Sequence, residues 1–165
     1  MSKHRKPIIG VMGPGNPKDS TILDHAEKIG RQIARKNWIL LTGGRKAGVM
    51  DAASRGASKS GGEVIGILPG DSHLGMSDYV SIPIVTGIGS ARNVVNILTA
   101  DVVIVCGMGL GTFSEAALAI KHGKPTLFTK VDKSHLNFFQ SLTEKKLLFF
   151  GETNLLFGFI EKELI

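Results

Sequence analysis

The chain lacks the features of disulfide-stabilised, membrane-spanning and nucleic-acid-binding proteins. Cys106 is its only cysteine, which excludes an intrachain disulfide framework and favours a reducing, cytoplasmic compartment. No apolar run reaches the ~20 residues of a membrane-spanning helix, and no signal-peptide pattern opens the sequence, so no membrane partner is expected. With one Tyr and one Trp, and no basic stripe interleaved with aromatics, nucleic-acid binding is not expected either.

The charge balance points to a small anionic partner. The formal net charge is +6, but half of that surplus comes from Lys3, Arg5 and Lys6, which precede any core pattern. We therefore expect a flexible basic tail over residues 1–6 and a single domain over residues 7–165. The mild surplus that remains on this domain would attract an anionic, phosphate-bearing small molecule.

Strand and helix patterns alternate along the whole chain, which is typical of parallel βαβ units. Strands are predicted at 7–12, 38–41, 63–68, 101–105, 125–128 and 147–150, and helices at 20–36, 48–59, 90–98, 113–121, 134–142 and 154–164. The sequence therefore predicts an α/β fold with three layers, in which a doubly wound, mostly parallel sheet has helices on both faces. Residues 81–86 are expected to form an edge strand or an extended connection, because Pro83 cannot donate to a ladder. Residues 69–79 are predicted to be a mobile surface loop, either a lid or a plain connection.

Residues 101–115, DVVIVCGMGLGTFSE, form the most informative stretch. Four consecutive β-branched residues predict a strand buried on both faces. A glycine-rich turn and then a helical pattern follow directly. Glycines let a ligand approach the backbone, and the first amides of a helix attract negative charge. The predicted anion-binding residues here are Gly107, Met108, Gly109, Leu110, Gly111 and Thr112.

Two further glycine-rich turns follow predicted strands. The first contributes Gly13, Pro14, Gly15 and Asn16, and the second contributes Gly43, Gly44 and Arg45. Because ligands of open α/β sheets bind beyond the carboxyl ends of the strands, we expect all three turns to line one crevice. A dinucleotide site is disfavoured, since Lys18 replaces the third glycine of that fingerprint and no carboxylate ends the second strand. No Walker A motif occurs.

Three charged residues are candidates for this crevice. Arg45 follows a glycine pair, and its planar guanidinium suits phosphate. Arg92 follows Gly89 and Ser90 in the first turn of a predicted helix, where a cation opposes the helix dipole; either a ligand or a surface ion pair would explain it. Glu115 has two interpretations: it completes a capping box with Thr112, or it faces the ligand.

The histidines give no sign of a metal centre. His25, His73, His122 and His135 lack metal-ligand spacing, so no metal bound by protein side chains is expected. Cys106, at the end of its strand, is interpreted as a small core residue.

Part of the sequence resembles the Lonely-Guy type of phosphoribohydrolases, long described as lysine-decarboxylase-like. Their signature P-G-G-x-G-T-x-x-E is matched in its latter part by GLGTFSE at 109–115, and TGGRKAGVM at 42–50 resembles their second turn. Arg92 matches their upstream arginine. Gly107 and Met108 stand where those enzymes have Pro and Gly.

A resemblance to the molybdenum cofactor carrier proteins covers nearly the whole chain. It rests on KPIIGVMGPG at 6–15, WILLTGGR at 38–45, IPIVTG and GSAR within 82–92, and GMG with GT within 107–112. Met108 agrees with this family. The resemblance implies a Rossmann-like homotetramer of the cytoplasm that serves metal transport: it binds and protects molybdopterin without transforming it. Molybdoenzymes or cofactor-synthesis proteins are the implied protein partners.

Two hypotheses follow. In the first, the chain is a carrier, not an enzyme, and its glycine loops hold the phosphate of the molybdenum cofactor. In the alternative, it is a nucleoside 5′-monophosphate phosphoribohydrolase in which Arg92 and Glu115 are catalytic.

Overall fold

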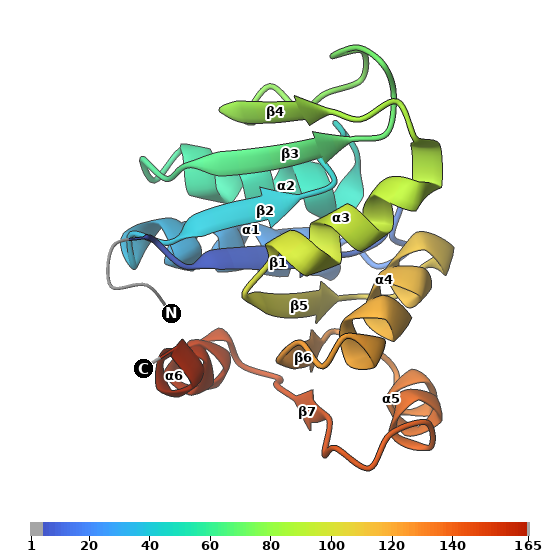
Figure 1. The fold of residues 1–165 in the computed structure, drawn as a ribbon. Helices are drawn as coiled ribbons and strands as arrows, with labels where there is room; N and C mark the ends of the chain where they lie inside the picture. The colour runs from blue at the N-terminus through green and yellow to red at the C-terminus, as the bar shows by residue number, and fades with distance from the viewer. Residues whose placement is uncertain (1–4, 165) are drawn as a thin grey trace.

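The computed structural model describes residues 5–164, and its centre is one parallel sheet of seven strands (Figure 1). The strand order is β4-β3-β2-β1-β5-β6-β7, and every neighbouring pair is parallel. The strands are β1 (Ile8–Met12), β2 (Ile39–Thr42), β3 (Val64–Leu68), β4 (Ile82–Val85), β5 (Val102–Cys106), β6 (Thr126–Thr129) and β7 (Leu148–Phe149). The α/β, doubly wound fold predicted from the sequence is confirmed.

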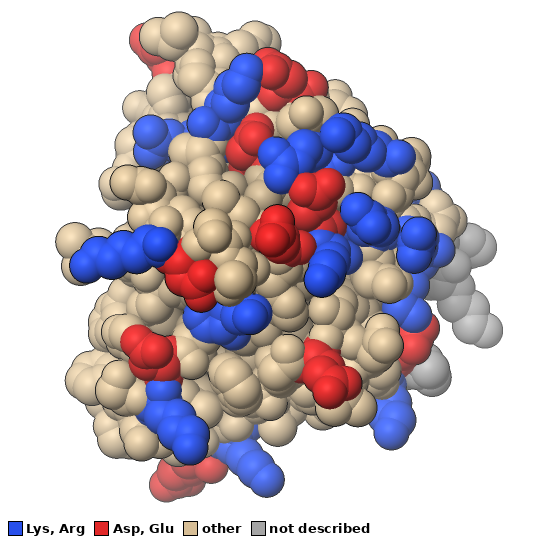
Figure 2. Space-filling model, turned by 180° about the vertical axis from the view of Figure 1, so that it is seen from behind, with Lys and Arg blue, Asp and Glu red and all other residues tan. Residues whose placement is uncertain are grey.

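Helices cover both faces of the sheet and complete three layers. One face packs against α1 (Thr21–Arg35), α2 (Gly48–Ser58) and α6 (Thr153–Leu164). The other packs against α3 (Arg92–Thr99), preceded by a 3-10 turn η1 (Gly89–Ala91), and against α4 (Leu110–Lys121) and α5 (Lys133–Gln140). On the outer surface of the first helical layer, Lys and Arg are interspersed with Asp and Glu (Figure 2). None of the described helices is both long and apolar enough to span a bilayer.

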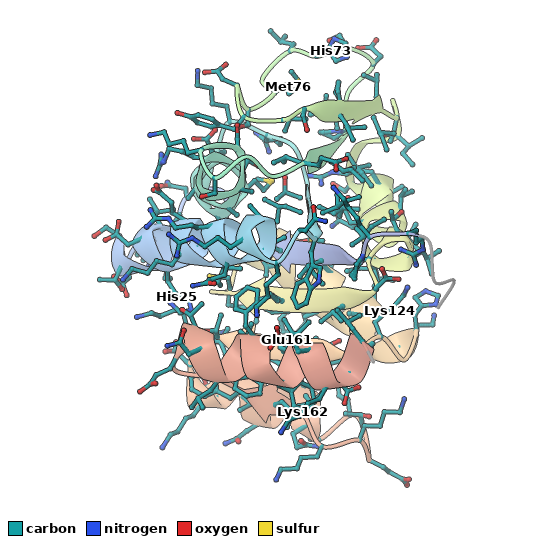
Figure 3. All side chains as sticks on the ribbon, turned by 90° about the vertical axis from the view of Figure 1, so that its left-hand side faces the viewer. His25, His73, Met76, Lys124, Glu161 and Lys162 are labelled. Atoms are coloured by element: carbon teal, nitrogen blue, oxygen red, sulfur yellow. The ribbon has the colours of Figure 1, made fainter. Side chains whose placement is uncertain are left out.

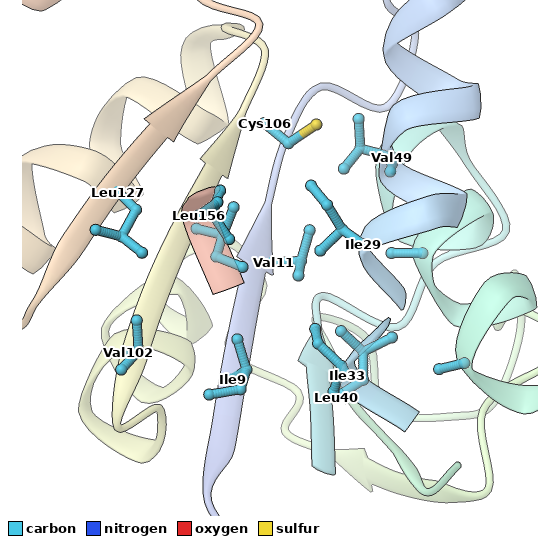
Figure 4. Packing of buried hydrophobic residues seen from close by; sticks show 14 of the residues in the cluster. Ile9, Val11, Ile29, Ile33, Leu40, Val49, Val102, Cys106, Leu127 and Leu156 are labelled. Atoms are coloured by element: carbon cyan, nitrogen blue, oxygen red, sulfur yellow. The ribbon is translucent and has the colours of Figure 1, made fainter. Parts of the chain in front are cut away.

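The central strands are buried on both faces, as the β-branched run predicted. All five residues of β5 are buried, and they alternate between the two hydrophobic cores. Val102 and Ile104 pack with Ile9, Val11 and the helices α1 and α6 (Figure 4), whereas Val103 and Val105 face α3, α4 and α5. Each such side chain stabilises the fold by roughly 1.5–3 kcal/mol, which holds β1 and β5 together at the middle of the sheet.

Helices α1 and α2 approach each other through glycines. A Cβ on Gly30 would lie 2.0 Å from the carbonyl oxygen of Ala53, and a Cβ on Gly56 would lie 2.0 Å from that of Glu27. Glycine is weakly destabilising inside a helix, so its presence at both positions is explained by this contact between backbones.

Strand β4 lies at one end of the sheet, so the edge position predicted from Pro83 is confirmed. The connection before it, residues 69–81, is attached to the second glycine turn. Ser77 N donates to Gly44 O at 2.9 Å, Lys46 N donates to Gly75 O at 2.8 Å, and the buried Ser77 hydroxyl donates to Asp51 at 2.7 Å. His73 and Met76 of this loop lie beyond β3 at the edge of the molecule (Figure 3). Its role as a lid stays a prediction.

The start of the predicted basic tail, residues 1–4, lies outside the described residues, as does residue 165. The two described tail residues form ion pairs. Arg5 donates both terminal nitrogens to Asp101, at 2.8 and 2.6 Å, and Lys6 Nζ donates to Glu63 at 2.6 Å. Asp101 also accepts from Ile8 N at 2.8 Å, which connects this segment to the start of β1.

Candidate functional site

The site candidate lies where the strand order reverses. From β1 the chain proceeds outward to β4, and it then returns to β5 beside β1 before proceeding outward to β7. Open α/β sheets bind ligands beyond the carboxyl ends of the strands at such a point. A cavity of about 270 Å³, here called the first cavity, occupies this position. Its lining residues are Val11, Met12, Gly13, Gly43, Arg45, Met50, Pro69, Gly89, Ser90, Arg92, Asn93, Gly111, Thr112 and Glu115.

The three glycine-rich turns, residues 13–16, 43–45 and 107–112, each contribute some of their residues to the lining of the first cavity. Pro14, Asn16, Met108 and Gly109 line a second cavity of about 370 Å³ on the other side of the β1 turn. The remainder of that second lining is Pro17, Lys18, Asp19, Ile22, Lys130, Val131, Asp132 and His135. Of the other predicted residues, Gly15, Gly44, Gly107 and Leu110 line neither cavity. The predicted site residues are therefore divided between two neighbouring cavities.

The two cavities are separated by contact between two loops. A Cβ on Gly109 would lie 3.1 Å from the Cβ of Pro14, and a Cβ on Gly107 would lie 3.3 Å from Pro14 Cδ. Gly107 also has a positive φ of 75°, a conformation that side-chain-bearing residues rarely adopt. These glycines therefore allow the β5 turn to pack against the β1 turn, which explains their presence without a ligand.

Arg92 is the cation at the base of the first cavity. Its side chain is 8% exposed, and its guanidinium packs on Gly43, where a Cβ would lie 2.1 Å from Nη1. Within residues 5–164 its Nε and Nη1 have no hydrogen-bond partner and no carboxylate lies within ion-pair distance. Burial lowers the pKa of Arg92, although Glu115 opposes this effect. The alternative of a surface ion pair is therefore wrong.

Glu115 faces Arg92 across the same cavity and is 7% exposed. Its Oε1 accepts a hydrogen bond of 2.9 Å from Asn96 Nδ2, while Asn96 Oδ1 has no partner within the described chain. Burial raises the pKa of the Glu115 carboxyl, and the Asn96 hydrogen bond and the Arg92 charge only partly offset that rise. Asn96 was not predicted as a site residue. Its position four residues after Arg92, on the same face of a helix, was the available signal.

The capping-box interpretation of Thr112 and Glu115 is wrong. Helix α4 begins at Leu110, three residues before the predicted start, because extended Gly109 is the N-cap and its carbonyl accepts from Phe113 N at 2.7 Å. Thr112 thus lies inside the first turn, and its buried hydroxyl has no described hydrogen-bond partner. Glu115 is bonded to α3 through Asn96 and not to the start of α4.

The groups around the first cavity fall into two sets: one can bind an anion, and the other can accept or donate hydrogen bonds. The guanidinium of Arg92, the exposed Arg45 and the first amides of α4, which lack intrahelical acceptors, can neutralise and hydrogen-bond an oxyanion. Glu115 and Asn96 can bind donor groups of the same ligand. Among residues 5–164, no three His, Cys, Asp or Glu side chains gather where they could hold a metal ion.

Comparison with known proteins identifies the family. Residues 6–155 match the SLOG cluster4 family. The structure superposes with a TM-score of 0.95 on the molybdenum cofactor binding protein of Rippkaea orientalis, with 45% identity over 99% of this chain and 100% of that chain. The molybdenum cofactor carrier protein of Chlamydomonas reinhardtii gives a TM-score of 0.91 at 45% identity, over 97% of this chain and 99% of that one.

A curated relative shares sequence over a shorter span. An uncharacterized protein of Archaeoglobus fulgidus is 42% identical over 116 residues, which make up 70% of this chain and 75% of that protein. Taken with the structural neighbours, these matches establish that the chain belongs to the SLOG cluster4 family and is a relative of the molybdenum cofactor carrier proteins.

Proposed function

We propose that this protein binds the molybdenum cofactor at the carboxyl edge of its sheet and carries it without chemical change. The observation that carries the proposal is Arg92, which lines the first cavity: the residue is only 8% exposed, and its Nε and Nη1 have no hydrogen-bond partner among the described residues. A buried cation is costly unless a counter-charge is bound. An anionic ligand supplies that charge, and proteins 45% identical to this chain are cofactor-binding and carrier proteins.

In this proposal the phosphate of the cofactor occupies the first cavity. Arg92 and Thr112 donate from the nitrogens and the hydroxyl that have no partner among residues 5–164, and Arg45 adds positive charge. The amides of Gly111 and Thr112 lie in the first turn of α4, where the helix dipole favours an anion. The cofactor supplies the redox chemistry in a recipient enzyme, whereas the residues named here bind and orient it.

The test compares bound pterin in two matched variants. Removing the guanidinium in Arg92→Met should weaken cofactor binding by roughly a hundredfold, because truncating a buried charged partner costs about 2–5 kcal/mol. Arg31→Met, which removes an exposed guanidinium of α1, is the control and should bind normally. Pterin fluorescence in the purified protein and titration with cofactor give the two affinities. If both variants bind equally well, the proposed site is wrong.

A second candidate, nucleoside 5′-monophosphate phosphoribohydrolysis, is favoured by one observation. Glu115 is a buried carboxyl with a raised pKa beside an arginine, which is the environment of a general acid. Incubation with AMP and an N6-substituted analogue, followed by detection of free base, distinguishes the two functions. We expect no free base. Turnover that disappears in Glu115→Gln would establish the hydrolase instead.

We further propose a homo-oligomer, a tetramer by resemblance, that exchanges cofactor with molybdoenzymes or cofactor-synthesis proteins. Apolar side chains exposed on β4 and α3 support self-association: Ile82 and Ile84 on β4, and Leu98 on α3, are 40%, 39% and 52% exposed. Exposed apolar groups that lie together commonly mark protein interfaces. Sedimentation velocity tests this directly, and a monomer at micromolar concentration would contradict it.

A further inference from the structure

A groove between α1 and the start of α6 has no role in the proposal above. This groove, here called the basic groove, has a volume of about 420 Å³. Its walls are His25, Lys28, Arg31, Gln32 and Arg35 of α1 and the segment 151–154, which leads into α6. The buried His25 lies beside one end of α6 (Figure 3) and bonds through Nε2 to the hydroxyl of Thr129, the last residue of β6, at 2.8 Å. One end of the basic groove therefore lies at the same edge of the sheet as the first cavity.

Three cations follow one another along the α1 wall of the basic groove. Lys28, Arg31 and Arg35 are exposed and are spaced by three and four residues, which places them on one face of the helix. Within residues 5–164, neither Lys28 nor Arg35 lies within ion-pair distance of a carboxylate. Arg31 has only Glu27 of its own helix, at 3.8 Å. The charged ends of these side chains are thus available to an anionic partner.

The acidic residues nearby do not compensate this charge. Glu27 lies outside the lining and is directed to α2, where its Oε2 accepts from Arg55 at 3.0 and 2.7 Å. Asp24 also lies outside the lining, and Glu152 is the one carboxylate within it. Burial lowers the pKa of His25, which is therefore uncharged at neutral pH. Three cations against one carboxylate give the lining a formal charge of +2.

The dimensions of the basic groove suit a short extended peptide. An α-helix rises 1.5 Å per residue, so the α1 wall from residue 25 to residue 35 is roughly 15 Å long and its cations recur about every 5 Å. An extended chain rises about 3.3 Å per residue and alternates its side chains, so carboxylates at alternate positions recur about every 6.6 Å on one face. Flexible lysine and arginine side chains can accommodate this small difference. Four or five extended residues would therefore fill the groove, as a rough estimate from these rises.

The chemistry of the lining favours an acidic protein segment over nucleic acid. The buried His25 has the one aromatic ring of the lining, so no exposed ring is present on which a base could stack. On the outer surface of this helical layer, Asp and Glu interrupt the Lys and Arg side chains (Figure 2), and no continuous basic stripe follows them. The amides of Gln32 and Asn154 can also hydrogen-bond to a peptide backbone.

We propose that the basic groove binds a short acidic segment of a partner protein, in which carboxylates at alternate positions pair with Lys28, Arg31 and Arg35. This inference rests on the proposed exchange of cofactor with other proteins, and it gives that partner a chemical description. A partner held in this groove would reach the carboxyl edge of the sheet, where the first cavity lies. Charge complementarity of this kind steers the encounter of two proteins and fixes their orientation.

The test uses a fluorescein-labelled hexaglutamate peptide and measures its anisotropy at about 0.15 M salt, where charges beyond about 8 Å are largely screened. The double variant Lys28→Glu, Arg35→Glu should bind the peptide about tenfold more weakly, because two attractive charges become repulsive. Lys121→Glu, Lys162→Glu makes the same charge change in the last turns of α4 and α6 and should stay within about twofold of the parent. Lys28→Arg, Arg35→Lys keeps both charges and should bind as the parent does. Matching thermal unfolding midpoints verify that each variant folds.

The outcomes separate this inference from the proposed function. Equal affinities of the two charge-reversed variants for hexaglutamate would overturn the basic groove as a docking site. An oligothymidylate of about twelve nucleotides that binds the parent more tightly than hexaglutamate does, and loses affinity in Lys28→Glu, Arg35→Glu, would overturn the acidic segment in favour of nucleic acid. Cofactor affinity should be the same in both charge-reversed variants. Failure of the parent to bind cofactor would refute the proposed function, whichever result the peptide gives.

Discussion

Gly43 lies directly against the guanidinium of Arg92, so any side chain at position 43 would have to displace that guanidinium. A Cβ at position 43 would lie 2.1 Å from Nη1 and 2.8 Å from Cζ of Arg92. The glycine that follows β2 thus leaves room for an arginine 49 positions later in the chain, in addition to forming the turn in which it lies. Arg92 in turn lines the first cavity at the carboxyl ends of the strands, and its buried Nε and Nη1 have no hydrogen-bond partner among residues 5–164.

Gly43→Ala should weaken ligand binding without unfolding the protein. The new methyl group must displace the guanidinium, so we expect the cofactor affinity to fall by about tenfold or more. This corresponds to a loss of about 1.4 kcal/mol or more of binding free energy. Isothermal titration with cofactor measures the change. Gly151→Ala, where a Cβ meets nothing within 4 Å, is the matched control. An unchanged affinity in Gly43→Ala would mean that the position of Arg92 is unimportant for binding.

Glu115→Gln should change the pH dependence of stability in a defined direction. The pKa of Glu115 is higher in the folded protein than its ordinary value because the carboxyl is buried. The folded state therefore binds the proton more tightly, and the stability supplied by this group is lost as the pH rises through the folded pKa. A glutamine is neutral throughout, so it should stabilise the protein relative to the parent more at pH 7 than at pH 4. Thermal unfolding across this range tests the prediction, which a constant difference would contradict.

The sequence predicted the central part of the fold because its signals there are local. The β-branched run before Cys106 becomes β5, and Pro83 marks the edge strand β4. The start of α4 was misplaced by three residues, because a threonine and a glutamate with capping-box spacing resemble a helix start more closely than Gly109 does. The N-cap residue Gly109 packs against Pro14, a contact across the fold that no local pattern contains.

Candidate site residues were predicted as one group and are divided between two cavities for a similar reason. The glycine turns indicate which strand ends can meet a ligand, but not on which side of the β1 turn each residue lies. Asn96 was missed because it has no motif of its own, and its importance comes from the partner Glu115 on another helix. Such pairings depend on the packing of α3 against α4, which the sequence does not specify locally.

Gly30→Ala should destabilise the protein although alanine is the better helix former. The added methyl would lie 2.0 Å from the carbonyl oxygen of Ala53 and would force α1 and α2 apart. We expect a loss of roughly 1–3 kcal/mol, which is typical of overpacking. Gly158→Ala in α6, where a Cβ meets nothing within 4 Å, should instead stabilise by about 0.5–1 kcal/mol. Urea denaturation measures both, and a stabilising Gly30→Ala would contradict the close helix contact.

The loop over residues 69–79 connects the site to the edge of the molecule, and its predicted role as a lid can be tested at Ser77. The Ser77 hydroxyl donates to Asp51, while its backbone N–H donates to Gly44 of the second glycine turn. Ser77→Ala should cost about 1 kcal/mol for the lost hydrogen bond and should speed hydrogen exchange in the loop. If the loop closes over a bound ligand, cofactor should slow exchange in residues 70–76 of the unmodified protein and should do so less in Ser77→Ala. If cofactor leaves hydrogen exchange in the unmodified protein unchanged, the loop is a plain connection. Pro69, which lines the first cavity, would then be the one residue of this segment that contacts the ligand.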